Sequence, residues 1–293
     1  MTEPAAPFLV AGGALRVQQV PVWQDNLVWL LTCTATGRTA AVDGPEAGPV
    51  LEACRAAGVT LDTVLVTHTH PDHVGILHEL EASGALEGVR VVGNPSRRAE
   101  IPGLSEEVGD GDVVQLGEVA LRVLATDGHQ TGHLCYLADG ALFCGDTLFA
   151  AGCGYLFDGP PAAMFRSLMR LAALPGDTWV CCAHEYTQDN LRFAWTLEPG
   201  NAALAHRIRE AWATRAQGRS CVPSRLAEEQ ATNPFLRPGS PELKERLQEV
   251  APGADLRTAA AVFAATRAAK DRGAYRELSE EILPLAVTSP LGS

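Results

Sequence analysis

The sequence predicts an α/β domain, in which stacked sheets carry helices on their outer faces, followed by a smaller all-helical domain. Short β-branched and apolar runs bounded by turn residues fill the first 184 residues, and helix-forming stretches interrupt them irregularly. Strand meanders mixed with helices favour stacked sheets over strict βαβ alternation. Beyond about Glu185 the strand signals cease and helical patterns follow. We therefore expect one domain at 1–184 and a helical one at 185–293.

The strand candidates share a short apolar core between turn residues. They span residues 14–20, 27–33, 39–42, 63–66, 89–92, 119–124, 134–137, 141–143 and 179–182. Between them the pattern predicts helices over 47–57, ending near Gly58, over 73–83, ended by Gly84, and over 161–174, ending at Pro175 and Gly176.

The C-terminal region has the periodicity of amphipathic helices. Apolar residues recur every fourth position from Leu204 to Trp212. Ser240, followed by proline, has the pattern of an N-cap, and Asp255 is the expected cap of a further helix that runs to about residue 271. Residues 280–293 form a weakly patterned tail to which we assign no role.

Length and composition fit a globular protein of this kind. The chain of 293 residues exceeds the usual single domain, and 46% hydrophobic residues with 20% charged residues are sufficient for a sizeable core. No run of about 18 apolar residues occurs, and the N-terminus lacks the basic start and apolar stretch of a signal peptide. We expect a cytoplasmic protein that contacts no membrane and is a monomer or a weak homo-oligomer.

Cysteine usage and charge narrow the possible partners. The eight cysteines are scattered, several lie in apolar runs, and no Cys-x-x-Cys pair exists, so reduced and mostly buried thiols are expected. The formal net charge of −12 argues against nucleic acid as a partner. A small-molecule substrate that is anionic would need a local basic patch.

The densest cluster of candidate metal ligands lies between Thr67 and His73, in the sequence Thr-His-Thr-His-Pro-Asp-His. It occupies a connection between a predicted strand and a predicted helix, where neighbouring side chains point in different directions. Imidazole nitrogens and carboxylate oxygens are ligands that Zn²⁺, Fe²⁺ and Mn²⁺ accept. His68 and His70 are therefore expected at one metal, and Asp72 and His73 at another.

Further candidate ligands follow the ends of three other strand candidates. His129 lies in a glycine-rich turn, Asp146 directly follows a strand, and His184 follows another. Asp146 is the candidate bridge between two cations, because each of its two oxygens can bind one. The alternative for this carboxylate is a helix or turn cap.

Three other histidines carry weaker signals. His133 is a ligand, a residue that supports the ligands from behind, or a residue that starts a helix. The last two roles are favoured because His129 already follows the first glycine of the turn. His78 and His206 sit in helical stretches without acidic or histidine neighbours in register, so structural roles are expected for both.

The string His68-x-His70-x-Asp72-His73, with His129, Asp146 and His184 following in order, resembles the metallo-β-lactamase superfamily. Several later motifs look like its glyoxalase II (hydroxyacylglutathione hydrolase) branch. They are Gly-Asp-Thr-Leu-Phe at 145–149, Ala-Gly-Cys-Gly at 151–154, Ala-His-Glu-Tyr-Thr at 183–187, Asn-Pro-Phe-Leu-Arg at 233–237 and Arg-Ala-Ala-Lys-Asp at 267–271. The resemblance implies the αββα sandwich of that superfamily as the catalytic domain, with a helical substrate-binding domain after it.

The resemblance also implies roles for individual residues. One metal is expected at His68, His70 and His129, a second at Asp72, His73 and His184, with Asp146 bridging the pair and Asp72 and Asp146 as the catalytic carboxylates. The expected substrate-binding side chains are Tyr155, Tyr186, Arg237, Arg267 and Lys270. The implied cofactors are two divalent metal ions, with zinc favoured and iron or manganese acceptable to the same ligands.

Two positions depart from the family pattern. Thr69 replaces the histidine that usually lies between the first two ligand histidines, a residue that the family does not use as a ligand. Tyr155 stands where the family commonly has Lys or Arg, at a position expected to pair with the glycine carboxylate of glutathione. A tyrosine hydroxyl can donate one hydrogen bond but brings no charge.

The expected reaction is metal-assisted hydrolysis of an S-2-hydroxyacyl thioester, with S-lactoylglutathione as the leading substrate and methylglyoxal detoxification as the process that the reaction would serve. Because a thiol has a pKa of roughly 8.5, the thiolate can leave without a general acid. Three alternatives remain: a thioesterase for another low-molecular-weight thiol, which Tyr155 favours, a mononuclear iron dioxygenase that acts on glutathione persulfide, and a non-catalytic metal-storage or interaction protein.

Overall fold

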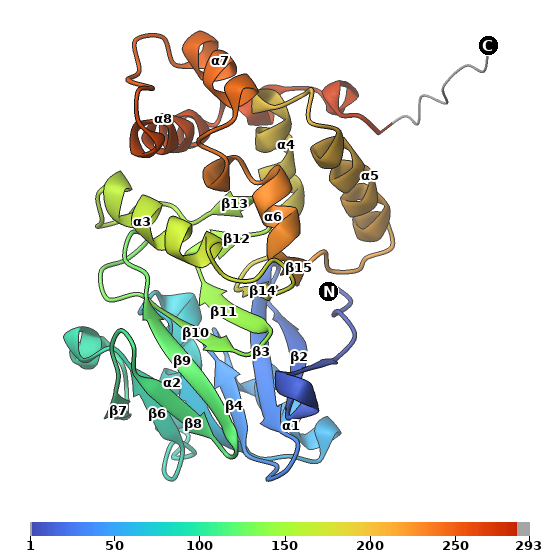
Figure 1. Cartoon of the computed structure of the whole chain (residues 1–293). Coiled ribbons are helices and arrows are strands. Elements are labelled where there is room, and N and C mark those ends of the chain that lie inside the picture. Colours follow the sequence, from blue (N-terminus) through green and yellow to red (C-terminus); the bar gives the residue numbers. More distant parts are fainter. Residues whose placement is uncertain (1, 286–293) are drawn as a thin grey trace.

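The computed structural model describes residues 2–285 as two stacked sheets with a group of helices at one end (Figure 1). The first sheet runs in chain order: β1 (Phe8–Val10), β2 (Leu15–Val22), β3 (Asn26–Cys33), β4 (Thr39–Val42), β5 (Leu61–Leu65), β6 (Arg90–Gly93) and β7 (Leu104–Glu107). The second has the order β15 (Ser224–Arg225), β14 (Trp179–Cys182), β11 (Ala141–Gly145), β10 (Leu134–Ala138), β9 (Val119–Ala125) and β8 (Val113–Leu116). A short hairpin pairs β12 (Leu148–Phe149) with β13 (Gly152–Cys153).

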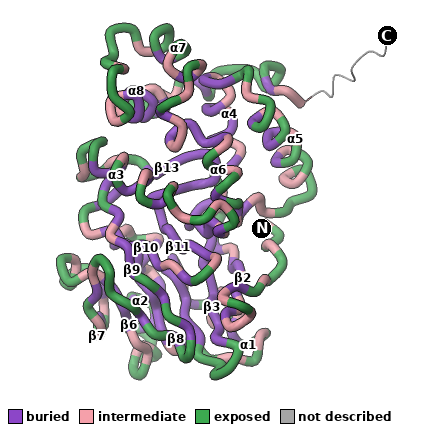
Figure 2. The backbone as a smooth tube through the Cα atoms, in the orientation of Figure 1, coloured by how far each residue is buried: buried purple, intermediate pink, exposed green. Residues whose placement is uncertain are grey.

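Strand β3 explains why the first sheet is buried on both faces. Its side chains alternate: Leu27, Trp29 and Leu31 belong to the core between the sheets, whereas Val28 and Leu30 belong to a second core on the opposite face. Since successive residues of a strand point to opposite faces, a strand covered on both sides is apolar at most of its positions. Figure 2 shows the buried residues concentrated in the strands.

Three helices complete the layers. α1 (Ala47–Ala57) and α2 (Pro71–Ala82) contribute the apolar residues that form the second core with the outer face of the first sheet. The buried residues of α3 (Pro161–Ala172) join the core that also contains the second sheet. α1 ends as predicted at Gly58, whose φ of 69° places it in the left-handed region that favours glycine.

The remaining helices gather at one end of the sandwich (Figure 1). They are α4 (Thr187–Leu197), α5 (Ala202–Ala216), α6 (Leu226–Thr232), α7 (Pro241–Val250) and α8 (Ala259–Asp271), with 3-10 turns η3 (Pro234–Leu236), η4 (Ala274–Glu277) and η5 (Glu280–Ile282). Ser240 caps α7 as predicted. The prediction that Asp255 caps α8 is wrong, because the Thr258 side chain accepts the capping hydrogen bond and Asp255 instead binds Arg257.

The structure adds strands that the sequence patterns did not indicate. β1, β7, β8, β12, β13 and β15 are at most four residues long, and their formation depends on pairing with a neighbour rather than on their own composition. The expectation that strands cease near Glu185 is wrong for β15, which pairs antiparallel with β14. A segment from the helical part thus extends the second sheet.

All eight cysteines are free thiols, and every one except Cys221 is buried, as expected from their placement in apolar runs. Within residues 2–285, no helix combines the length and the apolar character needed to cross a bilayer.

Strand directions bring several chain segments to one edge of the sandwich. β4 and β5 are parallel, and so are β11 and β14. β9 and β11 both pair antiparallel with β10, so they also run in the same direction. The connections that leave the carboxyl ends of these strands therefore lie close together.

A buried ion pair connects the helical part to this edge. Arg207 on α5 pairs with Glu229 on α6, and the Glu229 side chain is fully buried. The second carboxylate oxygen of Glu229 accepts a hydrogen bond of 2.8 Å from the backbone N–H of Ala151, in the β12–β13 turn. Glu229 thus holds two helices and a turn together.

Replacing Glu229 with glutamine should lower the free energy of unfolding by about 3–5 kcal/mol, because the buried charge of Arg207 loses its partner. Urea denaturation followed by circular dichroism measures the change. Glu228→Gln is the matched control: Glu228 is also 3.4 Å from Arg207 but half-exposed, and the expected loss is below about 1 kcal/mol. Equal losses in the two variants would contradict the role given to Glu229.

Candidate metal centre

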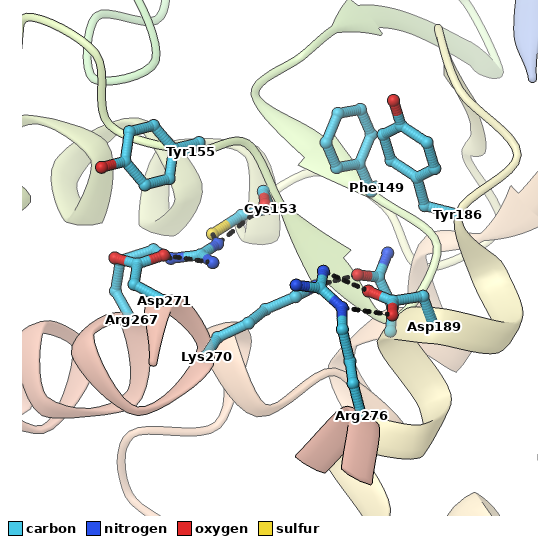
Figure 3. A pocket seen from close by; sticks show the side chains of 10 residues that line it. Phe149, Cys153, Tyr155, Tyr186, Asp189, Arg267, Lys270, Asp271 and Arg276 are labelled. Carbon is cyan, nitrogen blue, oxygen red and sulfur yellow. Dashed lines mark hydrogen bonds and ion pairs between the residues drawn. The ribbon is translucent and has the colours of Figure 1, made fainter. Parts of the chain in front are cut away.

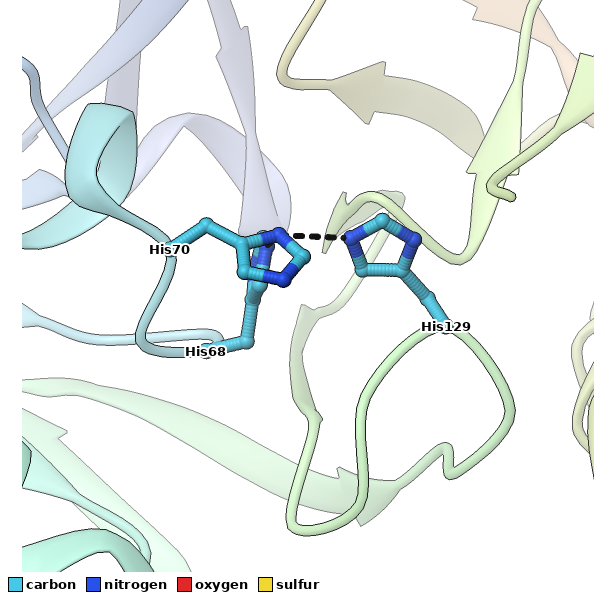
Figure 4. A group of neighbouring side chains, drawn as sticks. All are labelled: His68, His70 and His129. Carbon is cyan, nitrogen blue, oxygen red and sulfur yellow. Dashed lines mark hydrogen bonds between the residues drawn. The ribbon is translucent and has the colours of Figure 1, made fainter. Parts of the chain in front are cut away.

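The predicted ligands come together at the edge where the parallel strands end. Thr67 to His70 connect β5 to α2, and His73 lies in the first turn of that helix. The other three candidates are His129 between β9 and β10, Asp146 after β11 and His184 after β14. Figure 4 shows His68, His70 and His129 converging from two loops that are far apart in sequence.

The first ligand group consists of His68, His70 and His129, whose nitrogens lie within 4.8 Å of one another. Nδ1 of His70 is 3.0 Å from Nε2 of His68 and 3.0 Å from Nε2 of His129. Oδ2 of Asp146 lies 3.4 Å from the same nitrogen of His129. Three imidazole nitrogens that meet in this way match three ligands of a tetrahedral zinc site.

The second group consists of Asp72, His73 and His184. Nε2 of His184 is 3.3 Å from Oδ2 of Asp72 and 3.4 Å from Oδ1 of Asp146, and Nε2 of His73 is 3.5 Å from the latter oxygen. Asp146 therefore directs one oxygen to each group. This is the arrangement expected of a carboxylate that bridges two cations.

Unsatisfied atoms support a fit between these residues and metal ions. Nε2 of His73 and Oδ1 of Asp146 are buried and have no hydrogen-bond partner within residues 2–285. Buried polar atoms rarely remain unpaired, and those that do call for an ion, a water or a functional explanation. Both atoms point into the second ligand group, so a cation there would satisfy them.

Burial and the neighbouring carboxylates shift the pKa values of the candidate ligand histidines. Burial lowers the pKa of His68 well below its usual value, which keeps the ring neutral and its lone pair free for a metal. Burial also opposes the charged forms of His73 and His184, but the carboxylates around them, Asp146 above all, outweigh it and raise the pKa of His73 strongly and that of His184 to about 9. The carboxylates thus favour positive charge at the centre, whether from protons or from cations.

Asp43 supports the centre from behind, and sequence reasoning missed it. Its carboxylate accepts hydrogen bonds from the backbone N–H and the hydroxyl of Thr67, both 2.7 Å long, and lies 2.9 Å from Nδ1 of His73. That contact leaves Nε2 of His73 directed at the second group. A signal was present, because Asp43 follows a strand and precedes Gly44, just as Asp146 follows the end of β11.

Two more supporting residues come from the turn between β2 and β3 and from the first position of β3. Oδ1 of Asp25 lies 3.0 Å from Nδ1 of His184, and the amide of Asn26 donates a 3.0 Å hydrogen bond to Oδ2 of Asp72. Each contact orients one ligand of the second group. Nothing in the local sequence distinguishes this turn from any other polar turn.

Residue 155 acts on the first group through its backbone. The carbonyl oxygen of Tyr155 lies 2.7 Å from Nδ1 of His129, so that Nε2 of the ring faces the other histidines. Because residue 155 contributes only its main-chain carbonyl to this contact, the contact does not depend on the side chain at position 155.

His133 does not belong to either ligand group. It is fully buried, and its Nε2 accepts a 3.2 Å hydrogen bond from the backbone N–H of Asp146, which fits the supporting role favoured above. His78 is exposed on α2. The expectation that His206 has no acidic neighbour is wrong, because it lies 3.2 Å from Glu210 one helical turn away.

Two close approaches fix the loops around the ligands. Gly145 has a φ of 47°, and a Cβ atom there would lie 2.4 Å from the hydroxyl oxygen of Thr67, so only glycine fits in front of Asp146. Thr69, at the position that departs from the family pattern, donates its backbone N–H to the side-chain oxygen of Gln130 at 2.9 Å. This hydrogen bond joins the loop that carries His70 to the loop that carries His129.

A cavity of about 460 Å³ lies beside the metal centre, between the β12–β13 region and the helical part (Figure 3). Its lining residues are Phe149, Cys153, Tyr155, Tyr186, Asp189, Asn190, Arg267, Lys270, Asp271 and Arg276. Tyr186 stacks on His184 with ring centroids 4.8 Å apart and planes only 2° from parallel. A lining residue of the cavity is therefore in contact with an imidazole of the second ligand group.

Four of the five predicted substrate-binding residues line this cavity. Arg267 and Lys270 come from α8, whereas Tyr155 and Tyr186 come from the α/β part and its junction with α4. Arg237 does not line it, and the structure places its guanidinium against the buried carboxylate of Glu198, with contacts of 2.9 and 3.0 Å. That carboxylate would lose its partner if Arg237 turned towards a substrate.

Comparison with known proteins is consistent with this geometry. Residues 36–184 match the model of the metallo-beta-lactamase superfamily, and residues 185–273 match that of the hydroxyacylglutathione hydrolase C-terminus. The hydroxyacylglutathione hydrolase of Methylococcus capsulatus is 53% identical over 235 residues, which cover 80% of this chain and 91% of that protein. The hydroxyacylglutathione hydrolase of Photobacterium profundum is 44% identical over 258 residues, which cover 88% and 99%.

Solved structures confirm the predicted fold. ETHE1 from Myxococcus xanthus superimposes with a TM-score of 0.58 at 23% identity, over 88% of this chain and 99% of that one. A metallo-beta-lactamase from Staphylococcus aureus gives a TM-score of 0.56 at 17% identity, over 83% and 68%. At these identities the likeness concerns the fold alone.

The contacts of Asp43 predict a loss of metal affinity when it is changed. Asp43→Asn should weaken Zn²⁺ binding about 10- to 100-fold, because His73 loses the acceptor that orients it. Competition with a chromogenic chelator measures the affinity. Asp62→Asn is the control, since Asp62 also binds a backbone N–H but at the opposite ends of β4 and β5. If both variants bind Zn²⁺ as tightly as the unchanged protein, Asp43 has no such role.

Proposed function

Because this chain belongs to the hydroxyacylglutathione hydrolase family, within the metallo-beta-lactamase superfamily, we propose that it hydrolyses S-2-hydroxyacyl thioesters of glutathione. S-lactoylglutathione is the leading substrate, and D-lactate and glutathione are the products. The observation that carries the proposal is the shared carboxylate of Asp146, which faces both ligand groups beside a cavity with basic side chains.

The residues of both groups suit a pair of divalent cations. We assign His68, His70 and His129 to one cation and Asp72, His73 and His184 to the other, with Asp146 between them. When bound, such a pair supplies a nucleophilic water at neutral pH and polarises the thioester carbonyl. Zinc is the proposed metal, and iron or manganese would fit the same nitrogen and oxygen ligands.

The protein positions this chemistry through its fixed side chains. Asp43, Asp25 and the carbonyl of Tyr155 each hold one ligand histidine in the orientation that the centre needs. Phe157 packs edge-on against His70, with ring centroids 4.7 Å apart, and so borders the first group with an apolar ring. No side chain needs to protonate the leaving thiolate, since its conjugate thiol has a pKa of roughly 8.5.

The cavity is the proposed site for the thiol part of the substrate. Tyr186 is stacked on a ligand of the metal centre, so the cavity begins where the scissile bond would lie. Further in, Lys270 and Arg267 offer positive charge to an anionic carrier. We therefore propose that residues 185–293 supply much of the thiol-binding surface and that residues 1–184 hold the metal centre.

The competing functions have less support. A mononuclear iron dioxygenase would need only one of the two ligand groups, whereas this chain keeps both, and its relatives of 42–53% identity are named hydroxyacylglutathione hydrolases. The same relatives argue against a non-catalytic metal-storage protein. A thioesterase that acts on a thiol other than glutathione remains an alternative, because Tyr155 is uncharged where the family commonly has Lys or Arg. The free cysteines support our proposal of a reducing, cytoplasmic setting.

Hydrolysis of S-lactoylglutathione tests the proposal. The purified protein should contain two divalent metal ions per chain by elemental analysis and should lose its activity on dialysis against a chelator. Added Zn²⁺, Fe²⁺ or Mn²⁺ should restore activity and thereby identify the competent metal. Failure of the metal-loaded protein to hydrolyse this or any related thioester would refute the function.

Asp146→Asn should lower kcat on the order of 100-fold, because the substitution removes the charge that both ligand groups share. Asp139→Asn is the matched control, since Asp139 is an exposed aspartate in the β10–β11 turn of the same sheet. Full activity of Asp146→Asn would show that this carboxylate does not bridge the centre.

Lys270 predicts a pH dependence of substrate binding. Burial, assisted by the charge of Arg267, lowers the pKa of Lys270 to about 8, so the side chain is positive below pH 8 and loses its charge above it. KM for S-lactoylglutathione should therefore rise several-fold between pH 7 and pH 9. Lys270→Arg, which stays charged throughout this range, should show a flat KM. An identical rise in both proteins would assign the effect to another group.

A further inference from the structure

Arg276 is the exposed cation of the substrate cavity. It lies in the η4 turn that follows α8, and 61% of its side chain is exposed. In Figure 3 the side chain rises from that turn, and its guanidinium lies beside Asp189, while Tyr155 comes from a different wall of the cavity. Residue 276 lies beyond the segment 185–273 that matches the family model.

The other two cations of the cavity are buried, and both are also bound by neighbouring protein groups. Arg267 has 6% of its side chain exposed, lies 2.7 Å from the carboxylate of Asp271 and donates to the carbonyl of Cys153 at 3.1 Å. Lys270 is buried and donates its ammonium to the side-chain oxygen of Asn190. An additional anion entering from solvent would therefore meet Arg276 as the most accessible positive charge.

Asp189 holds the guanidinium of Arg276 in a fixed orientation. Its carboxylate accepts hydrogen bonds from Nε at 3.1 Å and from Nη2 at 3.3 Å, and it is itself bound by the hydroxyl of Tyr275 at 2.6 Å. Nη1 of Arg276 makes no hydrogen bond within the described part of the chain. A planar donor that is already oriented loses little side-chain entropy when it binds a carboxylate.

We propose that Arg276, oriented by Asp189, is a specificity-determining residue that binds a carboxylate on the thiol part of the substrate. The inference rests on the proposed thioester hydrolysis and deepens it. The inference also bears on position 155. Tyr155 brings no positive charge to its wall of the cavity, and Arg276 supplies a positive charge from another wall. The carrier expected is a small thiol with at least one carboxylate, which includes glutathione.

Steady-state kinetics with two matched substrates test this role. Arg276→Ala in the metal-loaded enzyme should raise KM for S-lactoylglutathione about five- to tenfold, a size between that of an exposed ion pair and that of a charged hydrogen bond. kcat should stay within about twofold, because Arg276 does not touch the reacting bond. The Kd of S-hexylglutathione, which is not hydrolysed, should rise by the same factor in calorimetry.

The second substrate is the diethyl ester of S-lactoylglutathione, which keeps the peptide and the thioester but has no free carboxylate. Its KM should be the same for the unchanged enzyme and for Arg276→Ala, since the contact is absent in both. A KM that rises equally for both substrates would mean that Arg276 only shapes the cavity, and the inference would be wrong.

Arg272→Ala is the matched control, because Arg272 is an exposed arginine four residues earlier whose guanidinium binds the carbonyl of Val250 outside this cavity. It should change KM less than twofold. If Arg272→Ala and Arg276→Ala raise KM equally, the effect comes from the net charge of the protein and the proposal is wrong. Arg276→Gln, which keeps part of the side chain and a hydrogen-bond donor but has no charge, should behave like Arg276→Ala and guards against misfolding of the latter. If the enzyme without any substitution shows no thioesterase activity, the proposed function itself is refuted.

Discussion

The candidate metal centre depends on the buried carboxylate of Asp43, which orients one of its histidines. This one side chain joins the connection after β4 to the connection after β5, because it binds both Thr67 and His73. With 4% of Asp43 exposed, water cannot replace these bonds, and each is stronger than it would be at the surface. The ring of His73 consequently faces Asp146, the carboxylate that lies between the two ligand groups.

Patterns that are local in sequence predicted much of this molecule. β4, β14 and α1 have the expected bounds, and all seven expected metal ligands meet at one edge, since a dense ligand string and strand-end residues need only nearby sequence to be recognised. Short strands such as β8 were missed because they depend on partners far along the chain. The contacts of Asp25 and Asn26 were missed for the same reason: each spans a large separation that composition does not encode.

The basic residues show where a motif ceases to specify function. Arg237 matched a family motif, yet a buried glutamate holds it away from the cavity, whereas Arg276 belongs to no recognised motif and lines the cavity. The environment of each guanidinium, rather than its presence in the sequence, decides whether it can meet a ligand. A buried carboxylate holds its arginine as a partner, whereas a carboxylate at the cavity rim only orients the guanidinium.

The two-residue strand β15 has a consequence for dissection of the protein. The chain leaves the second sheet after β14, forms α4 and α5, and returns as β15 to cover the outer side of that same strand. A fragment that stops at residue 184 would keep every proposed metal ligand but would bare a row of unpaired backbone groups along β14. Such an edge invites pairing between copies, so the truncated protein would tend to aggregate rather than persist as a minimal enzyme.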